Sequence, residues 1–224
     1  MTFYVNYFNH TNYSEKYIHR LMKVLKIKAR IRLKKTNRVQ TKPEQIGDNI
    51  LGRNFEAEYP NQKWCTDVTE FKVPGQKKKI YLSAIIDLFD KTIISYVISH
   101  RNDNKLVFDT FDKAIKLNPG AHPIFHSDRG FQYTSKSFKL KLDENGMIQS
   151  MSRVGKCIDN GPMEAFWGTL KSEMFYGIHF ENEQALINKI EEYIYNYNNW
   201  RLQKKLGTTP NQYRYYAQKP INLI

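Results

Sequence analysis

The sequence predicts a mixed α/β protein in which a partly antiparallel sheet is flanked by helices and preceded by a short basic helical arm. Three observations lead to this fold class. The chain has 224 residues, of which 41% are hydrophobic and 14% aromatic, and this is enough to build a core. From Lys63 onward, segments rich in β-branched and aromatic residues alternate with segments of helical periodicity. Residues 1–53 carry twelve Lys and Arg against three acidic residues, so +9 of the net charge of +13 lies before residue 54.

The basic arm contains one amphipathic helix. Ser14 is a good N-cap, and apolar residues recur after it at helical spacing, which predicts a helix of about three turns with a basic polar face. The apolar residues are Ile18, Leu21, Met22 and Leu25. A run of alternating basic residues follows over 26–35. The polar stretch over 36–60 shows no clear period and contains Pro and Gly, so we interpret it as a linker. A solvated helix face with a flexible tail is the alternative interpretation of the arm.

The remainder of the chain predicts a sheet and its covering helices. We expect strands over 64–73, 80–89 and 92–99, joined by short turns at 75–78 and 90–91 and therefore antiparallel. A helix then ends at Asn118-Pro119-Gly120, and a strand over 122–127, a helix over 134–145 and a strand over 147–152 follow. A loop over 153–159 leads to a helix over about 161–175, with Asn160 as its N-cap, and a last helix spans 183–197.

Charge and cysteine content restrict the class of protein. A net charge of +13 makes a polyanion the expected partner, and nucleic acid is the leading candidate. The two cysteines, Cys65 and Cys157, form neither a disulfide framework nor a zinc-binding pattern, which indicates a reducing compartment. The most apolar stretch, 81–99, is interrupted by charged residues, so we expect neither a membrane span nor secretion.

Three carboxylates occupy positions that are unusual for charged residues. Asp67 lies in the middle of a predicted buried strand, and Asp128 ends another strand before a Gly-containing turn. Glu164 falls in the first turn of a predicted helix, with 35 residues between it and Asp128. Such a trio suits phosphodiester cleavage and transfer with two hard cations, which also relieve the repulsion among the carboxylates. The alternative is that Glu164 only favours a helix N-terminus and Asp128 is an ordinary turn residue.

Several motifs in order resemble the integrase-like catalytic core of bacterial insertion-sequence transposases, in the downstream frame of the insertion sequence three family. The matching strings are Trp64-Cys65-Thr66-Asp67-Val68-Thr69, Tyr81-Leu82-Ser83-Ala84-Ile85-Ile86-Asp87-Leu88-Phe89, His126-Ser127-Asp128-Arg129-Gly130-Phe131-Gln132-Tyr133-Thr134-Ser135, Ser150-Met151-Ser152-Arg153 and the segment from Asp159 to Glu173. The segments Tyr197-Asn198-Asn199-Trp200-Arg201 and Leu206-Gly207-Thr208-Thr209-Pro210 resemble the C-terminal signature of that family. The resemblance covers residues from about 60 to 215.

The resemblance implies a ribonuclease H-like fold, a topology that matches the predicted element order. It implies that Asp67, Asp128 and Glu164 are the metal ligands of a DDE transposase that cleaves and joins DNA during transposition. The expected cofactor is Mg²⁺, as two ions, with Mn²⁺ as a substitute. The expected partners are double-stranded DNA, both element ends and target, and further copies of the chain on that DNA. The resemblance further implies a bacterial protein that is cytoplasmic and nucleoid-associated. Lys171 matches a basic residue that the family places beside DNA.

The domains expected from this resemblance are a partial helix-turn-helix-like basic arm over 1–35, the linker over 36–60, the integrase-like core over 61–180 and its C-terminal helical extension over 181–224. Residues 1–10 look unlike the family's N-terminal segment, so we expect a truncated arm with a single helix. An upstream frame is a possible fusion partner. The residues expected to contact DNA are Arg20, Lys23, Lys28, Arg30, Arg32, Lys34, Lys35 and Lys171. Alternatives are a catalytically silent DNA-binding remnant or host-adopted transposase, and a ribonuclease H or junction-type nuclease.

Overall fold

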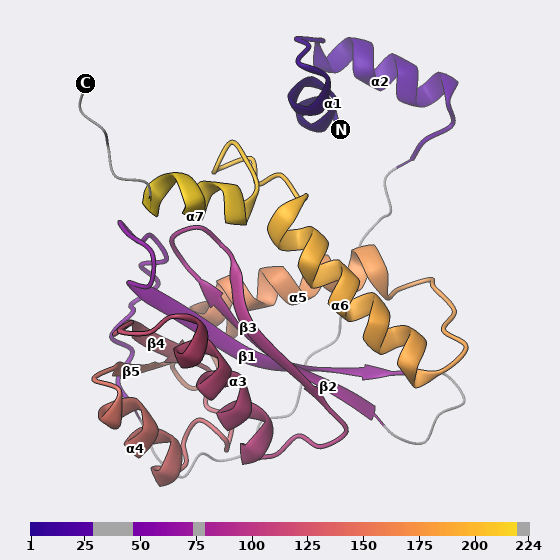
Figure 1. The fold of residues 1–224 in the computed structure, drawn as a ribbon. Helices are drawn as coiled ribbons and strands as arrows, with labels where there is room; N and C mark the ends of the chain where they lie inside the picture. The colour runs from indigo at the N-terminus through magenta and orange to yellow at the C-terminus, as the bar shows by residue number, and fades with distance from the viewer. Residues whose placement is uncertain (29–46, 74–78, 219–224) are drawn as a thin grey trace, which may run out of the picture.

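A five-stranded mixed sheet forms the centre of the protein (Figure 1). The structure is a computed structural model that describes residues 1–28, 47–73 and 79–218. The strands lie in the order β3-β2-β1-β4-β5 and span Lys63–Lys72 (β1), Lys79–Asp87 (β2), Ile93–Ser99 (β3), Ile124–Ser127 (β4) and Ile148–Met151 (β5). β1, β2 and β3 pair antiparallel, whereas β4 is parallel to β1 and β5 is parallel to β4. The predicted meander followed by a crossover is therefore confirmed, while the predicted turn at 75–78 lies outside the described residues.

Helices cover both faces of the sheet (Figure 1). On one face, α3 (Asn104–Leu117) and α4 (Lys136–Glu144) pack with apolar residues of the strands, including Trp64 and Phe125. On the other face, α5 (Gly161–Met174) and α6 (Glu183–Asn199) bury their apolar stripes against β1 and β2, where Cys65 and Leu82 lie. The alternation of side chains along β1 sends successive residues to opposite layers, which gives the fold two cores.

Asn160, the predicted N-cap of α5, does not cap the helix with its side chain. Asp103, Ser135 and Asn182 each accept a hydrogen bond from a backbone N–H in the first turn of α3, α4 and α6. Asn160 occupies the N-cap position of α5 but makes no such bond, because its Nδ2 donates to the carbonyl oxygen of Thr66 in β1 at 3.0 Å. The predicted loop before α5 also contains a short 3₁₀ helix, η1 (Cys157–Asn160). Asn160 therefore joins α5 to the sheet instead of capping it.

Two helices lie before residue 29, where the sequence predicted one. The predicted helix is α2 (Glu15–Val24), and Ser14 caps it by accepting from the backbone N–H of Tyr17. The additional helix is α1 (Thr2–Asn9). The Tyr7 hydroxyl lies 3.0 Å from the Thr208 hydroxyl and donates to Gln212 of α7 (Pro210–Gln218) at 2.8 Å. The expectation of a single helix is wrong: the aromatic-rich segment over 2–9 is also helical, and its Tyr4 and Tyr7 hydroxyls bond to residues over 202–212.

The second part of the predicted linker packs against the core. Leu51 is buried, and its backbone N–H donates to the Ser150 hydroxyl at 2.9 Å. Asn49 and Arg53 both donate to the carboxylate of Asp159, at 3.0 and 2.6 Å. Residues 47–60 therefore do not separate the arm from the core, as the polar composition suggested, because their hydrogen-bond partners belong to the core. Residues 36–46 lie outside the described part of the chain. Within the described part, no helix is both long and apolar enough to cross a membrane.

Candidate active site

The pairing of β1 with β4 places Asp67 of β1 near Asp128, which directly follows β4. In the parallel β1–β4 pair, Cys65 lies opposite His126. The same offset, continued by two residues, aligns Asp67 with Asp128, and neighbouring strands lie about 4.8 Å apart. Because side chains alternate along a strand, Asp67 faces the same layer as Cys65, which is the layer that contains α5. Both carboxylates are partly exposed.

Backbone amides fix the orientation of both aspartates. Asp67 Oδ1 accepts from the backbone N–H of Val68 at 2.8 Å, and Asp128 Oδ1 accepts from that of Gly130 at 2.9 Å. A Cβ atom at Gly130 would lie 3.1 Å from Asp128 Oδ1 and 3.0 Å from the side-chain oxygen of Gln132. Glycine at this position therefore allows the turn to close around the Asp128 carboxylate.

Tyr133 is a buried residue near both aspartates. Its ring is buried, and its hydroxyl lies 3.2 Å from the Thr66 hydroxyl. The pKa of Tyr133 is raised well above its usual value, mainly by burial and further by the negative charges of Asp67 and Asp128. A neutral tyrosine thus lies beneath the aspartate pair.

The third carboxylate, Glu164, lies in the first turn of α5 and is exposed. Two side chains attach this helix to β1 next to Asp67. Asn160 donates to Thr66, as described above, and Trp167 Nε1 donates to Asp67 Oδ2 at 2.9 Å. Trp167 follows Glu164 by three residues, so both side chains lie on neighbouring positions of one helical face. The helix that carries Glu164 is thereby held against the strand that carries Asp67.

Asp159 anchors the segment that leads into α5. Its side chain is buried, and it accepts bonds from Arg153 Nε at 2.8 Å, Arg153 Nη2 at 2.9 Å and Arg53 Nε at 2.6 Å. The hydrogen bonds from Arg153 and Arg53 hold the pKa of Asp159 well below its usual value. Asp159 therefore remains ionised and joins residues 47–60 to the start of α5.

The chemistry of the donor set suits a hard divalent cation, since carboxylate oxygens are the ligands that Mg²⁺ prefers. Within the described residues, however, no three His, Cys, Asp or Glu side chains are close enough together to hold a metal ion. The structure places Asp128 directly after β4, the strand that pairs with β1 and its Asp67, and it places Glu164 on the adjacent helix with its side chain exposed.

Lys171, a residue expected to contact DNA, has a buried side chain. Its side chain is only 5% exposed, and its ammonium group donates to the Thr69 hydroxyl and to the Glu70 carbonyl oxygen. The same group lies 4.9 Å from the centre of the Phe71 ring. Its contact with DNA stays a prediction, while in the structure the side chain turns toward β1 and secures α5 to the sheet.

The other residues expected to bind DNA fall into two groups. Arg20, Lys23 and Lys28 are exposed on and after α2. Arg30, Arg32, Lys34 and Lys35 lie outside the described residues.

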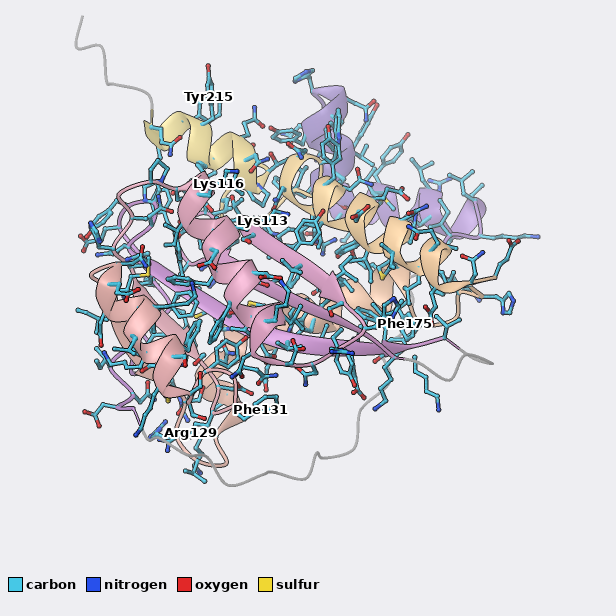
Figure 2. All side chains as sticks on the ribbon, turned by 60° about the horizontal axis from the view of Figure 1, so that its bottom comes forward. Lys113, Lys116, Arg129, Phe131, Phe175 and Tyr215 are labelled. Atoms are coloured by element: carbon cyan, nitrogen blue, oxygen red, sulfur yellow. The ribbon has the colours of Figure 1, made fainter. Side chains whose placement is uncertain are left out.

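Close to the carboxylates, the loop after β4 carries Arg129 and Phe131, which Figure 2 shows at one edge of the protein. The Phe131 ring is 52% exposed.

Sequence reasoning missed the residues that surround the carboxylates. Trp167 and Tyr133 lie inside the motifs that carry the resemblance, but their residue types alone indicate no role in the site. The spacing of three residues between Glu164 and Trp167 is the one sequence signal that could have indicated Trp167. For Tyr133 and Asn160, only the three-dimensional contacts reveal the connection to the site.

Comparisons with known proteins agree with this geometry. A model of the integrase core domain matches residues 57–157, and a second integrase core model matches residues 164–217. The chain is 45% identical over 209 residues to InsK of insertion sequence element IS150 from Escherichia coli K12, which carries the name of a transposase; this covers 92% of the chain and 73% of InsK. It is 42% identical over 202 residues to an uncharacterized transposase-like protein of Haemophilus influenzae, covering 90% of the chain and 93% of that protein.

Among solved structures, the trimeric form of the HTLV-2 integrase catalytic core domain in complex with magnesium has the same fold. The TM-score is 0.55 at 21% identity, and the match covers 70% of this chain and 97% of that one. The sheet and its helices therefore define an integrase-type catalytic core of the ribonuclease H-like class. The chain belongs to the insertion sequence three family of transposases. Its function is that of a DDE transposase in the transposition of an insertion sequence.

Proposed function

We propose that Asp67, Asp128 and Glu164 are the catalytic carboxylates of this transposase and that they hold two Mg²⁺ ions, for which Mn²⁺ can substitute. The observation that carries the proposal is the parallel β1–β4 pair, whose register, extended by two residues, aligns Asp67 with Asp128 beside the helix that bears Glu164. We expect the exposed Glu164 side chain to turn toward the aspartates when the cations bind. The magnesium complex of the integrase core with the same fold supports the choice of metal.

In this proposal the protein holds the reacting groups and the DNA in place. The cations would supply charge stabilisation at the attacking and leaving oxygens of an in-line displacement. Asp67 and Asp128 keep fixed orientations through the backbone amides of Val68 and Gly130. Either water or a terminal 3′-hydroxyl attacks the phosphorus of a phosphodiester, and the P–O bond to the leaving 3′ oxygen breaks. The same site therefore serves cleavage and joining, and no covalent intermediate with the protein forms.

The partner in this reaction is double-stranded DNA, both at the element ends and at the target. The net charge of +13 favours binding to its phosphates, and exposed Arg20, Lys23 and Lys28 are suited to contacts of this kind. Joining two element ends to one target requires several active sites, so we propose that copies of the chain assemble on the DNA. An upstream frame fused to the chain would add to this assembly. The site of action would be the bacterial cytoplasm, at the nucleoid.

The test is substitution of each carboxylate by its amide. Asp67→Asn, Asp128→Asn and Glu164→Gln should each abolish Mg²⁺-dependent cleavage and strand transfer on DNA with element ends, while the circular-dichroism spectrum stays unchanged. The matched control is Asp112→Asn, which removes an exposed carboxylate that pairs with Lys141 away from the site. It should retain full activity.

Three results would contradict the proposal. Full activity in any of the three folded amide variants would exclude that residue from the catalytic set. A wild-type chain that binds DNA but neither cleaves nor joins it, with either Mg²⁺ or Mn²⁺, would identify the protein as a silent DNA-binding remnant. Cleavage of RNA–DNA hybrids without strand transfer would favour a ribonuclease H.

A further inference from the structure

Trp167 is a buried polar side chain whose hydrogen bond is made to a proposed metal ligand. Its ring is 7% exposed and packs in the core between the sheet, α5 and α6, where the ring of Phe166 lies 5.0 Å away between centroids. An indole N–H is a donor only, and a buried one needs an acceptor. That acceptor is Asp67 Oδ2, at 2.9 Å.

The bond has two consequences for the site. The Asp67 carboxylate receives donors on both oxygens, among them Val68 N–H on Oδ1 and Trp167 Nε1 on Oδ2, and this fixes the rotation of the carboxylate plane. Each carboxylate oxygen has two lone pairs, so neither bond prevents coordination of a cation. The bond also sets the position of α5 relative to β1, and therefore the position of Glu164 relative to Asp67.

We propose that Trp167 is a positioning residue that orients Asp67 for metal binding and sets the distance between Asp67 and Glu164. This inference rests on the proposed function, since it assumes that these carboxylates hold the cations. Partners that orient metal ligands are worth about 10- to 100-fold in metal affinity or activity. Loss of the indole N–H should therefore weaken the response to Mg²⁺ and leave the fold intact.

The experiment compares Trp167→Phe with Trp64→Phe in the full-length chain. Both substitutions remove a buried indole N–H and keep an aromatic ring, but Trp64 Nε1 donates to Asn61 at 3.3 Å and not to a carboxylate of the site. We expect Trp167→Phe to need about tenfold more Mg²⁺ for half-maximal strand transfer. We expect Trp64→Phe to stay within about twofold of the wild type, because no metal ligand loses a partner. Mn²⁺, which binds protein ligands more tightly, should restore part of the activity of Trp167→Phe.

A second measurement needs no activity and no core substitution. The chain has three tryptophans, so ¹⁵N labelling of the indoles gives three N–H signals, of which that of Trp200 comes from a ring that is 58% exposed. On titration of wild-type protein with Mg²⁺ in the absence of DNA, the Trp167 signal should shift and saturate, while the Trp200 signal should stay constant. If Trp167→Phe fails to fold, this titration decides the question alone.

The outcomes separate the inference from the proposed function. If the wild type is active with Mg²⁺ but the Trp167 signal does not respond, the positioning role is refuted and the catalytic assignment stands. Equal Mg²⁺ requirements of folded Trp167→Phe and Trp64→Phe lead to the same conclusion. If the wild type is inactive with Mg²⁺ and with Mn²⁺ and no indole signal moves, both proposals fail.

Discussion

Arg214 closes a buried charge cluster that holds the C-terminal helix against the sheet, and its removal should be costly. Arg214 of α7 donates to the carboxylates of Asp87 and Asp90, the latter at 2.5 Å, and to Asn118 Oδ1 at 3.1 Å. Both aspartate side chains are fully buried. Substitution by Met keeps much of the volume but leaves two buried carboxylates without their cation. Breaking a buried ion pair on one side costs about 3–5 kcal/mol.

The assay is urea and thermal unfolding of Arg214→Met followed by circular dichroism. For a chain of this length the expected loss corresponds to a fall in Tm of about 10 °C. The matched control is Arg201→Met, whose partner Glu173 is 39% exposed and whose loss should cost less than about 1 kcal/mol. Adding Asp87→Asn to Arg214→Met should recover part of the loss, because one uncompensated charge is removed. Equal stability of the two single variants would refute this explanation.

Three further predictions concern pH, the arm and the turn at Asp128. Burial lowers the pKa of His126 in the folded protein to about 4, whereas the unfolded chain has the ordinary value of about 6.5. As the pH falls from 6.5 to 4, the unfolded state binds the proton first, and the free energy of unfolding should decrease by about 3 kcal/mol. In urea unfolding at several pH values across this range, the free energy of unfolding of His126→Gln should depend less steeply on pH than that of the wild type. An unchanged pH dependence would exclude His126 as the cause. Deletion of residues 1–46 should reduce the slope of log DNA affinity against log salt concentration by several units, at about 0.9 per phosphate contact. Titrations with end-derived and scrambled duplexes measure this slope. A strong preference for the end sequence that is lost on deletion would instead show that the arm reads sequence. Gly130→Ala should displace the Asp128 carboxylate and reduce strand transfer about tenfold with little loss of stability, because misplaced reacting groups are penalised steeply.

The elements that local sequence patterns determine were predictable. Apolar and aromatic alternation located all five strands, and short connections correctly indicated the antiparallel meander. The alignment of Asp67 with Asp128 follows from the pairing of β1 with β4, for which the sequence gives only indirect evidence. The motifs that resemble a transposase family group these two residues with Glu164 at the level of sequence, without any knowledge of strand pairing.

Features that depend on contacts between distant residues were not predictable. Lys171 lies on a helix, and helical spacing cannot show whether its ammonium group turns outward or toward Thr69. Asn160 has the residue type of an N-cap, yet its amide bonds to Thr66 instead. Residues 47–60 have the composition of a linker, but composition does not reveal that Asn49 and Arg53 find the buried Asp159.

The three carboxylates are held by two different kinds of interaction, and this difference has a consequence for how the site can change. Asp67 lies within β1 and Asp128 directly follows β4, so a shift of β1 against β4 would change their spacing and also disturb the centre of the sheet. Glu164 depends on α5, whose position next to β1 is set by side chains, among them Asn160 and Trp167. A substitution in one of these attachments can move Glu164 without breaking a strand. We therefore expect variation in metal affinity and rate to arise at the attachments of α5, whereas removal of an aspartate carboxylate should abolish activity altogether.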